Sequence, residues 1–466
     1  MSKIEVNTVE PQCGTNLTVG ASGDTITFPS GTTVVNNGSQ TGFGRTGTVD
    51  WDTTPKTATF SAVSGNGYFC NTTSSAFTVN LPAGSAGAIV SLADYAGTWQ
   101  TNNLTVSPQS GEKIGGVSVD VALNTEGQSV TFVYVDSTQG WINVQDSTSN
   151  ERGNPFIVAT GGTITCCGDY KIHTFTGPGT FTVTNGGAAP GSNTVDYLIV
   201  AGGGGGGQRS GGPSGVRGGG GGGAGGARMS SGTASGCYTA SPLGACASAL
   251  PVTAQDYPII VGGGGTGATT DCTSGGQGSN SIFSTITSAG GGGGGYGGCL
   301  TVINGGSGGG GGGGGTPTGG TGNTPPVSPP QGNNGSPGFA SGPDNIGGGG
   351  AGGGAGAVGG CGSVPGAIGG AGGNGIANSI TGSLVTRAGG GGSGVTKQSP
   401  TPINIQGGPG GSGGGGAGSG AGSPSPTIQP SVAGSTNTGG GGGGAGNLSG
   451  GAGGGSGIVI IRYKFQ

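Results

Sequence analysis

Short segments in which apolar and polar residues alternate fill the chain between residues 48 and 146. Two examples are Phe77-Thr-Val-Asn-Leu81 and Ser129-Val-Thr-Phe-Val-Tyr-Val135. Alternation of period two, bounded by Gly, Pro and Asn, is typical of strands with one buried face. No helical pattern competes with it. We therefore predict an antiparallel β-sandwich or roll for residues 48–150.

A second group of alternating segments follows. It contains Lys171-Ile-His-Thr-Phe175, Thr180-Phe-Thr-Val183 and Tyr197-Leu-Ile-Val200. These segments predict a small β unit over residues 151–201, closed by the apolar C-terminal segment 457–466. His173, the single histidine of the chain, lies on one of the predicted strands. Because no nucleophile or carboxylate accompanies it in the sequence, we expect a packed or surface histidine rather than a catalyst.

Glycine dominates residues 202–456, in runs such as 202–207, 218–223, 290–295, 308–315 and 439–444. A Gly-rich segment is by default a flexible linker, because ordering glycine costs more backbone entropy than ordering any other residue. Recurrence of the runs, apolar inserts such as Ile282-Phe283, and strand-like segments on both sides favour order instead. We predict left-handed helices of the polyglycine-II type, packed side by side with loops at both ends and essentially no α-helix.

Composition narrows the function classes. The chain has 466 residues, of which 128 are Gly and only 6% are charged, with a net charge of −4 and a pI near 4.9. An acidic balance argues against nucleic acid or an anionic membrane as partner, since both attract basic surfaces. No apolar run reaches the ~18 residues of a membrane-spanning helix, and the N-terminus does not resemble a signal peptide. We expect a soluble protein made in a cytoplasm, without membrane insertion.

Cysteine usage agrees with a reducing compartment. The nine cysteines form no Cys-x-x-Cys pair, and one histidine cannot complete a mixed zinc site. Free thiols are therefore expected, with a Cys237–Cys246 disulfide as an alternative in an oxidising exterior. We expect no metal and no cofactor. The cysteines are Cys13, Cys70, Cys166, Cys167, Cys237, Cys246, Cys272, Cys299 and Cys361.

Patterns that would indicate catalysis are weak. Asp50 and Asp52 flank Trp51 as a pair of carboxylates, but no titrating partner accompanies them, so we interpret them as solvated turn residues. The Gly-x-Gly-x-x-Gly pattern occurs repeatedly as a by-product of composition, whereas a phosphate loop also needs a preceding strand and a following helix. We therefore expect no enzymatic activity.

The first 47 residues contain only short alternating segments, such as Thr25-Ile-Thr-Phe28. This is too little apolar material for an independent core. We predict that residues 1–47 form an arm and linker that depends on a partner, either identical chains or a docking surface.

Several motifs together resemble one class of protein. They are Met1-Ser-Lys-Ile-Glu-Val-Asn-Thr-Val9, Trp51-Asp-Thr-Thr-Pro-Lys-Thr57, Asp94-Tyr-Ala-Gly-Thr98, and the pairing of Asp196-Tyr-Leu-Ile-Val200 with Ile458-Val-Ile-Ile-Arg-Tyr463. They are similar to tail-fibre proteins of tailed bacteriophages, especially phages of marine cyanobacteria. The resemblance implies a virion component synthesised in the host cytoplasm and assembled as a homotrimer. It also implies that the N-terminal arm attaches to the tail or baseplate, and that the Gly-rich segment is an adhesin-type domain.

Such a fibre would bind a host glycan or outer-membrane protein through loops at its outward end. Aromatic rings stack on sugar faces, and arginines pair with acidic glycans. The alternative for each aromatic residue is burial in a small interior core. The candidate receptor-binding residues are Tyr238, Tyr296, Phe339, Arg209, Arg217 and Arg387.

Two other functions remain as alternatives. The first is a purely structural virion connector or decoration fibre, in which the Gly-rich part is a spacer. The second, a depolymerising tailspike, would need paired carboxylates in a groove and a β-helix repeat, and the sequence shows neither pattern.

Overall fold

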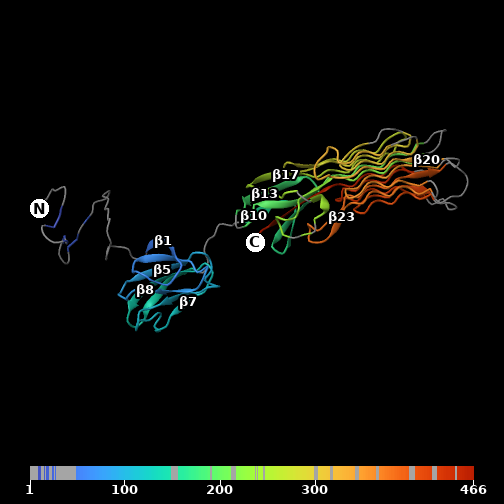
Figure 1. The fold of residues 1–466 in the computed structure, drawn as a ribbon. Coiled ribbons are helices and arrows are strands. Elements are labelled where there is room, and N and C mark those ends of the chain that lie inside the picture. The colour runs from blue at the N-terminus through green and yellow to red at the C-terminus, as the bar shows by residue number, and fades with distance from the viewer. Residues whose placement is uncertain are drawn as a thin grey trace. The chain divides into compact units, whose positions relative to one another are not determined.

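The computed structural model divides into two compact units, residues 1–152 and 153–466 (Figure 1). The N-terminal arm predicted for residues 1–47 lies almost entirely outside the described residues. The structure describes residues 9–11, 15, 17–19, 24–25, 27, 49–147, 156–188, 191–210, 217–236, 238, 240–244, 247–298, 303–314, 318–341, 346–363, 367–397, 405–421, 428–446 and 449–466.

Two sheets face one another in the first unit. One has the strand order β1-β3-β5-β8-β9, and the other has the order β2-β4-β6-β7. The first six strands therefore enter the two sheets alternately. The nine strands of this unit are β1 (Asp50–Lys56), β2 (Phe60–Ser61), β3 (Asn66–Cys70), β4 (Phe77–Asn80), β5 (Ile89–Asp94), β6 (Leu104–Ser107), β7 (Val121–Leu123), β8 (Ser129–Asp136) and β9 (Gly140–Ser147).

The direction of these strands corrects the prediction of an antiparallel module. β1, β3 and β5 pair in parallel, as do β2, β4 and β6, and antiparallel pairing is confined to the later strands β7, β8 and β9. Because successive strands go to opposite sheets, each sheet receives every second strand in the same direction. Period-two alternation reports which face is buried and carries no information on strand direction.

The core of the first unit lies between its two sheets. Trp99 and Trp141 are fully buried there, together with inward-facing strand residues such as Val79, Leu92 and Leu104. Burying each large apolar side chain contributes about 1.5–3 kcal/mol. This core fixes the faces of both sheets, so the alternate residues of β1, β3 and β5 point outward.

The two larger sheets of the second unit lie at one end of it, which we call the sheet end (Figure 1). Strand β27 lies between β12 and β14, so the C-terminal segment closes a sheet begun almost 300 residues earlier in the sequence. One sheet contains β11 (Thr163–Cys167), β12 (Tyr170–Phe175), β27 (Ile458–Lys464), β14 (Thr194–Val200), β15 (Ala227–Met229) and β16 (Leu250–Pro251). The other contains β10 (Ile157–Thr160), β13 (Gly179–Gly186), β17 (Gln255–Ile260), β18 (Ser281–Phe283) and β19 (Ile286–Ser288).

His173 on β12 is buried between these two sheets. Its Nδ1 lies 2.7 Å from the carbonyl oxygen of Gly161, so Nδ1 carries the proton, and Nε2 accepts a hydrogen bond from the Tyr463 hydroxyl at 3.1 Å. Burial lowers the pKa of His173 and raises the pKa of Tyr463 to about 12. This histidine is a packed residue that joins the two sheets.

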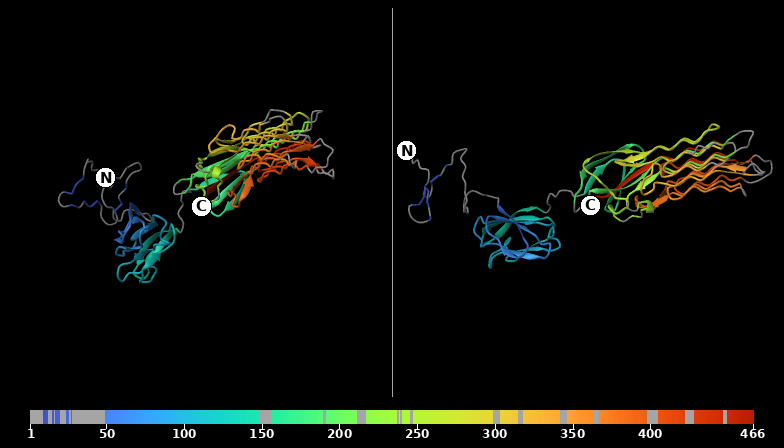
Figure 2. Two further views of the ribbon diagram at one scale, coloured as in Figure 1. Left: turned by 45° about the vertical axis from the view of Figure 1, so that its right-hand side comes forward. Right: turned by 45° about the horizontal axis from the view of Figure 1, so that its top comes forward.

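Glycine-rich segments extend side by side from the sheets, as both views of Figure 2 show. The N–H groups of residues 202–207 donate in turn to three neighbouring segments, 276–279, 452–455 and 220–223, and the order repeats with a period of three residues. The segment 218–226 likewise donates to 289–295, 347–353 and 439–445. These hydrogen bonds satisfy backbone groups that have no partner within their own segment.

Glycine is required in these segments because the neighbouring backbones are close. A Cβ atom on Gly222 would lie 2.1 Å from the carbonyl oxygen of Gly204.

The secondary structure of the chain is mostly β, and the one helical element among the described residues is the 3-10 turn η1 (Pro242–Gly244). The prediction of a β protein with essentially no α-helix is confirmed. Short strand pairs interrupt the glycine segments: β20 (Phe339–Ser341), β21 (Ile346–Gly348), β22 (Ile376–Asn378), β23 (Val385–Arg387), β24 (Val395–Lys397), β25 (Gly420–Ala421) and β26 (Ile428–Gln429).

Candidate functional site

Loops that join the glycine segments lie at either the sheet end or the opposite end, where Figure 1 places β20 and which we call the far end. Gln208 connects several far-end loops. Its backbone N–H donates to Thr273 O at 3.1 Å, and its backbone carbonyl accepts from the N–H of Gly297 at 3.1 Å. Its side-chain amide donates to Thr269 O at 3.2 Å. Backbone and amide hydrogen bonds therefore hold loops from distant parts of the sequence against one another.

Four of the six predicted receptor-binding residues lie at the far end and two at the sheet end. Arg209, Arg217, Tyr296 and Phe339 belong to far-end loops or strands, and all four side chains are half-buried. Tyr238 lies beside the sheets. The sixth residue, Arg387, lies on β23, which Figure 1 places near the sheet end.

The two far-end arginines have no carboxylate partner within the described part of the chain. Neither Arg209 nor Arg217 forms an ion pair with any residue that the structure describes. The guanidinium of Arg217 occupies the space over Gly314, whose φ of 93° and lack of a side chain permit this contact. A Gly218 N–H bond to Gly347 O, 3.2 Å long, anchors the adjacent backbone to β21. Both guanidinium groups can therefore receive an acceptor from outside the protein.

The two far-end aromatic residues have different surroundings. The hydroxyl of Tyr296 accepts a weak hydrogen bond from the Cys272 thiol at 3.2 Å, and Cys272 itself is exposed. Phe339 lies against a small cluster that includes Ile346 and Val395, and its ring covers Gly348. Phe339 therefore both packs on a core and keeps part of its ring accessible.

The sheet-end candidates are built into the interior. Tyr238 packs on the core cluster around β14, and the guanidinium carbon of Arg462 lies 5.2 Å from its ring centroid. Burial raises the pKa of Tyr238. Arg387 is only 7% exposed, its Nη1 has no hydrogen-bond partner among the described residues, and burial lowers its pKa. Tyr238 is half-buried with its ring against this apolar cluster, which is the packing that the sequence analysis gave as the alternative to receptor binding.

A buried polar network at the sheet end was missed by the sequence analysis. Asp196 is fully buried and accepts hydrogen bonds from the Ser230 hydroxyl at 2.6 Å and from the N–H and hydroxyl of Ser235 at 2.8 and 2.6 Å. Arg462, opposite Asp196 on β27, lies with its guanidinium carbon 4.6 Å from the ring centroid of Tyr170. A charged residue at the start of an apolar strand was the signal that would have indicated this network. Its role is to hold the loop after β15 on the sheet.

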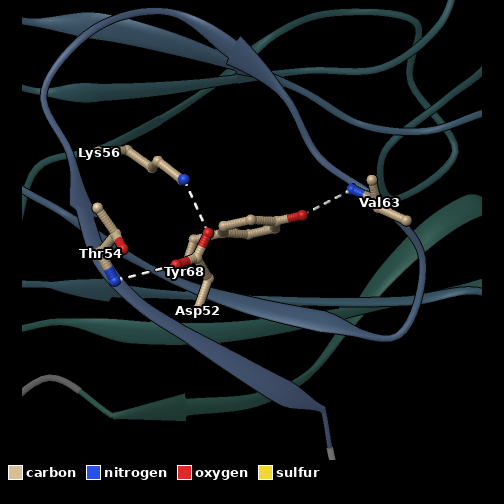
Figure 3. Close-up of polar contacts among 5 residues, drawn as sticks. All are labelled: Asp52, Thr54, Lys56, Val63 and Tyr68. Atoms are coloured by element: carbon tan, nitrogen blue, oxygen red, sulfur yellow. Dashed lines mark hydrogen bonds and ion pairs between the residues drawn. The ribbon is translucent and has the colours of Figure 1, made fainter. Parts of the chain in front are cut away.

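Asp52, one of the two carboxylates that flank Trp51, has a local structural role (Figure 3). Asp52 forms an ion pair with Lys56 at 2.7 Å and accepts a hydrogen bond from the Thr54 N–H at 2.9 Å. The hydrogen bond from Lys56 is the largest cause of the lowered pKa of Asp52. In the same view, the buried Tyr68 hydroxyl accepts from the Val63 N–H at 2.9 Å. The Asp52 contacts lie within β1, where its pairing with β3 shifts register between Asp52 and Lys56, so Asp52 is a strand residue rather than the turn residue expected from the sequence, and these contacts favour its ionised form.

Other features of the described residues carry less chemistry. A cavity of about 550 Å³ is lined mainly by apolar residues, including Leu243, Ile376 and Leu384. Five cysteines, including Cys70 and Cys361, are free thiols, whereas Cys237 and Cys246 lie outside the described residues. Within the described part of the chain, no three His, Cys, Asp or Glu residues come together as a metal site, and no helix is long and apolar enough to cross a membrane.

Together, the two sheets and the glycine segments define an all-β protein with a glycine-rich scaffold. The family model of a glycine-rich domain matches residues 173–464, more than half of the 466-residue chain, so the protein belongs to this glycine-rich domain family. The match covers the sheets from β12 onward and the far-end loops. No curated protein matches the sequence.

Proposed function

We propose that this protein is a virion tail fibre of a tailed bacteriophage, and that its far-end loops bind a glycan or outer-membrane protein on the host surface during adsorption. One observation carries the proposal: two arginines that form no ion pair with any described residue, and two partly accessible aromatic side chains, lie at the far end of a glycine scaffold. Variable loops on a rigid scaffold suit recognition. The sequence motifs that resemble phage tail fibres supply the biological setting.

Charge favours an acidic group on the receptor. Residues 153–466 contain eight Lys and Arg and five Asp and Glu, in contrast to the acidic balance of the whole chain. A planar guanidinium forms paired hydrogen bonds with a carboxylate or phosphate, so Arg209 and Arg217 would hold an acidic sugar while Tyr296 stacks beside it. In this role the protein performs no catalysis.

We also infer that the glycine segments are helices of the polyglycine-II type. Three-residue periodicity of the hydrogen bonds supports this geometry, which has about three residues per turn and no internal hydrogen bonds. Negative φ within 202–207 and 218–226 also supports it. Hydrogen exchange tests it: amides across 308–313 should exchange slowly, and exchange at random-coil rates would contradict the inference.

Assembly completes the proposed function. We expect a homotrimer whose N-terminal arm attaches to the phage tail or baseplate, with the protein located in the virion. Sedimentation of the purified full chain measures the oligomeric state. Immunogold labelling of particles locates the protein, and labelling absent from the tail would remove the proposed attachment.

Adsorption to host cells is the decisive test. The full chain is incubated with candidate marine cyanobacterial hosts, and the protein that sediments with the cells is measured. An Arg209→Ala, Arg217→Ala double variant should bind at least about tenfold more weakly, since hydrogen bonds to charged groups contribute ~1.5–3 kcal/mol each. Arg228→Ala is the matched control, because Arg228 is a half-buried arginine on β15 at the sheet end.

Each outcome of this test separates the candidate functions. Adsorption that the double variant loses and the control retains supports receptor binding by the far end. Failure of the full chain to adsorb, together with its retention on phage particles, would favour a structural connector or decoration fibre. Equal adsorption by all three proteins would place recognition outside Arg209 and Arg217.

A further inference from the structure

Aromatic side chains form a strip on the outer face of the five-stranded sheet in the first unit. Trp51 on β1 is 43% exposed, Phe69 on β3 is half-buried, and Tyr95 just after β5 is 56% exposed. Most large aromatic residues of a folded protein are buried, so exposed ones on a single sheet face call for an explanation. We call Trp51, Phe69 and Tyr95 the aromatic strip.

The ring of Trp51 lies over bare backbone. Trp51 is paired with Gly67 across the strands, and a Cβ on Gly67 would lie 2.7 Å from the indole Cδ2. The indole also contacts Phe69, with ring centroids 4.9 Å apart and planes inclined by 33°. One face of the indole therefore rests on the sheet, and its exposure comes from the other face.

Register places Tyr95 on the same side of the sheet. Phe69 is paired with Ala93, and Tyr95 follows Ala93 by two residues, which returns its side chain to the same face. The Tyr95 N–H continues the ladder with a 3.1 Å hydrogen bond to Cys70 O. The strip thus crosses three adjacent strands.

Flat aromatic faces suit sugar rings, whose C–H faces stack on aromatic rings while their hydroxyls bond to nearby polar groups. Asn71 lies two residues beyond Phe69, and its Oδ1 accepts from the N–H and the hydroxyl of Thr73 at 3.1 and 2.6 Å. Its amide nitrogen remains available as a donor. The strip therefore combines stacking surfaces with a hydrogen-bonding group.

Charge selects the class of sugar. Residues 1–152 contain five Lys and Arg and twelve Asp and Glu, a formal charge of −7. This field repels acidic or sulfated glycans and nucleic acid. It also opposes contact between two copies of the same face, since each copy brings the same negative charge.

We propose that the aromatic strip is a second carbohydrate-binding site, specific for the chain of a neutral polysaccharide. Sugar rings stack on Trp51, Phe69 and Tyr95, and Asn71 donates a hydrogen bond to a ring hydroxyl. The site belongs to a different unit from the far-end loops. It favours neutral sugars, whereas the far-end loops favour acidic ones. It stands whether or not the far end binds a host receptor.

Tryptophan fluorescence of the full chain tests the site directly. The chain has three tryptophans, and Trp99 and Trp141 are fully buried, so Trp51 alone is accessible to a ligand or to acrylamide. The probes are cellohexaose, maltohexaose, xylohexaose and mannohexaose. At least one should change the emission in a saturable way and protect it from acrylamide.

Variants separate binding from folding. Trp51→Ala should abolish the fluorescence response. Tyr95→Ala, which leaves the reporter in place, should weaken binding roughly 2- to 12-fold, the factor expected for one stacking contact. Val135→Ala is the matched control, since Val135 is an exposed residue of β8 in the same sheet and should bind as the unaltered chain does.

Several results would overturn the proposal. One is the absence of a response to all four hexasaccharides, and another is unchanged affinity in Tyr95→Ala. Tighter binding of dextran sulfate than of the neutral sugars would contradict the charge argument. Trp51 emission that shifts with protein concentration in the absence of sugar would show that a second copy covers the strip. None of these results affects adsorption through Arg209 and Arg217, so the two proposals fail separately.

Discussion

A single methyl group added inside the glycine scaffold should destabilise the second unit strongly. Gly222 is buried, and its N–H and carbonyl form hydrogen bonds of 2.8 Å with Gly442 and Gly391. In Gly222→Ala, the new Cβ would lie 2.1 Å from Gly204 O and 2.6 Å from Gly204 C. At least one neighbouring segment must therefore move away.

The expected cost follows from two contributions. Overpacking in a close-packed interior costs about 1–3 kcal/mol, and weakening two buried hydrogen bonds costs about 0.5–1.5 kcal/mol each. Alanine also lowers the conformational entropy of the unfolded chain, which offsets about 0.4–1 kcal/mol of this cost. We therefore expect Gly222→Ala to lower the free energy of unfolding by about 1–6 kcal/mol.

Gly263→Ala is the matched control. Gly263 belongs to an exposed part of a neighbouring glycine segment, and its added Cβ would meet no heavy atom within 4 Å. The lower conformational entropy of the unfolded chain is then the one remaining effect, so this variant should be neutral or more stable by up to about 1 kcal/mol. The two substitutions have identical chemistry and opposite expected signs.

Denaturant unfolding with two probes distinguishes the units. All three tryptophans lie in the first unit, so tryptophan fluorescence follows that unit and should be the same in both variants. Hydrogen exchange across residues 218–226 follows the glycine scaffold. Equal protection of this segment in Gly222→Ala and in the unaltered chain would refute the reasoning, because it would mean that the neighbouring backbones are not in close contact.

Three further predictions concern polar contacts in the two units. Burial lowers the pKa of His173 from 6.5, so the folded state disfavours protonation of this residue. The second unit should therefore be fully stable above pH 6.5 and lose stability as the pH falls below 6.5. His173→Gln should flatten this pH dependence in a series of unfolding curves. Arg462→Lys loses the planar guanidinium that lies beside Tyr170 and should cost about 1–3 kcal/mol by denaturant unfolding, whereas an unchanged midpoint would contradict the stacking role. Tyr68→Phe removes the acceptor of the Val63 N–H in a part-buried hydrogen bond and should cost the first unit about 0.5–1.5 kcal/mol, read by tryptophan fluorescence; no loss would mean that another acceptor replaces the hydroxyl.

The sequence by itself determined many of the strands and the near absence of helices, but it did not indicate β1, β11 or the short strands β20–β26. Alternation over residues such as Phe77–Asn80 reports a strand with one buried face, since side chains point to opposite faces with a period of two. Apolar segments on both sides of the glycine-rich region also indicated that β27 joins the sheet begun by β12 and β14. These features depend on local side-chain patterns, which a sequence contains directly.

Tertiary structure alone decided strand direction and the placement of the candidate residues. Parallel pairing in the first unit follows from the alternation of successive strands between two sheets, which local patterning does not encode. Arg217 lies at the far end and Tyr238 beside the sheets because each glycine segment sends its following loop to one end or the other. Glycine has no side chain to specify its neighbours, so backbone hydrogen bonds between segments distant in sequence determine where every loop lies.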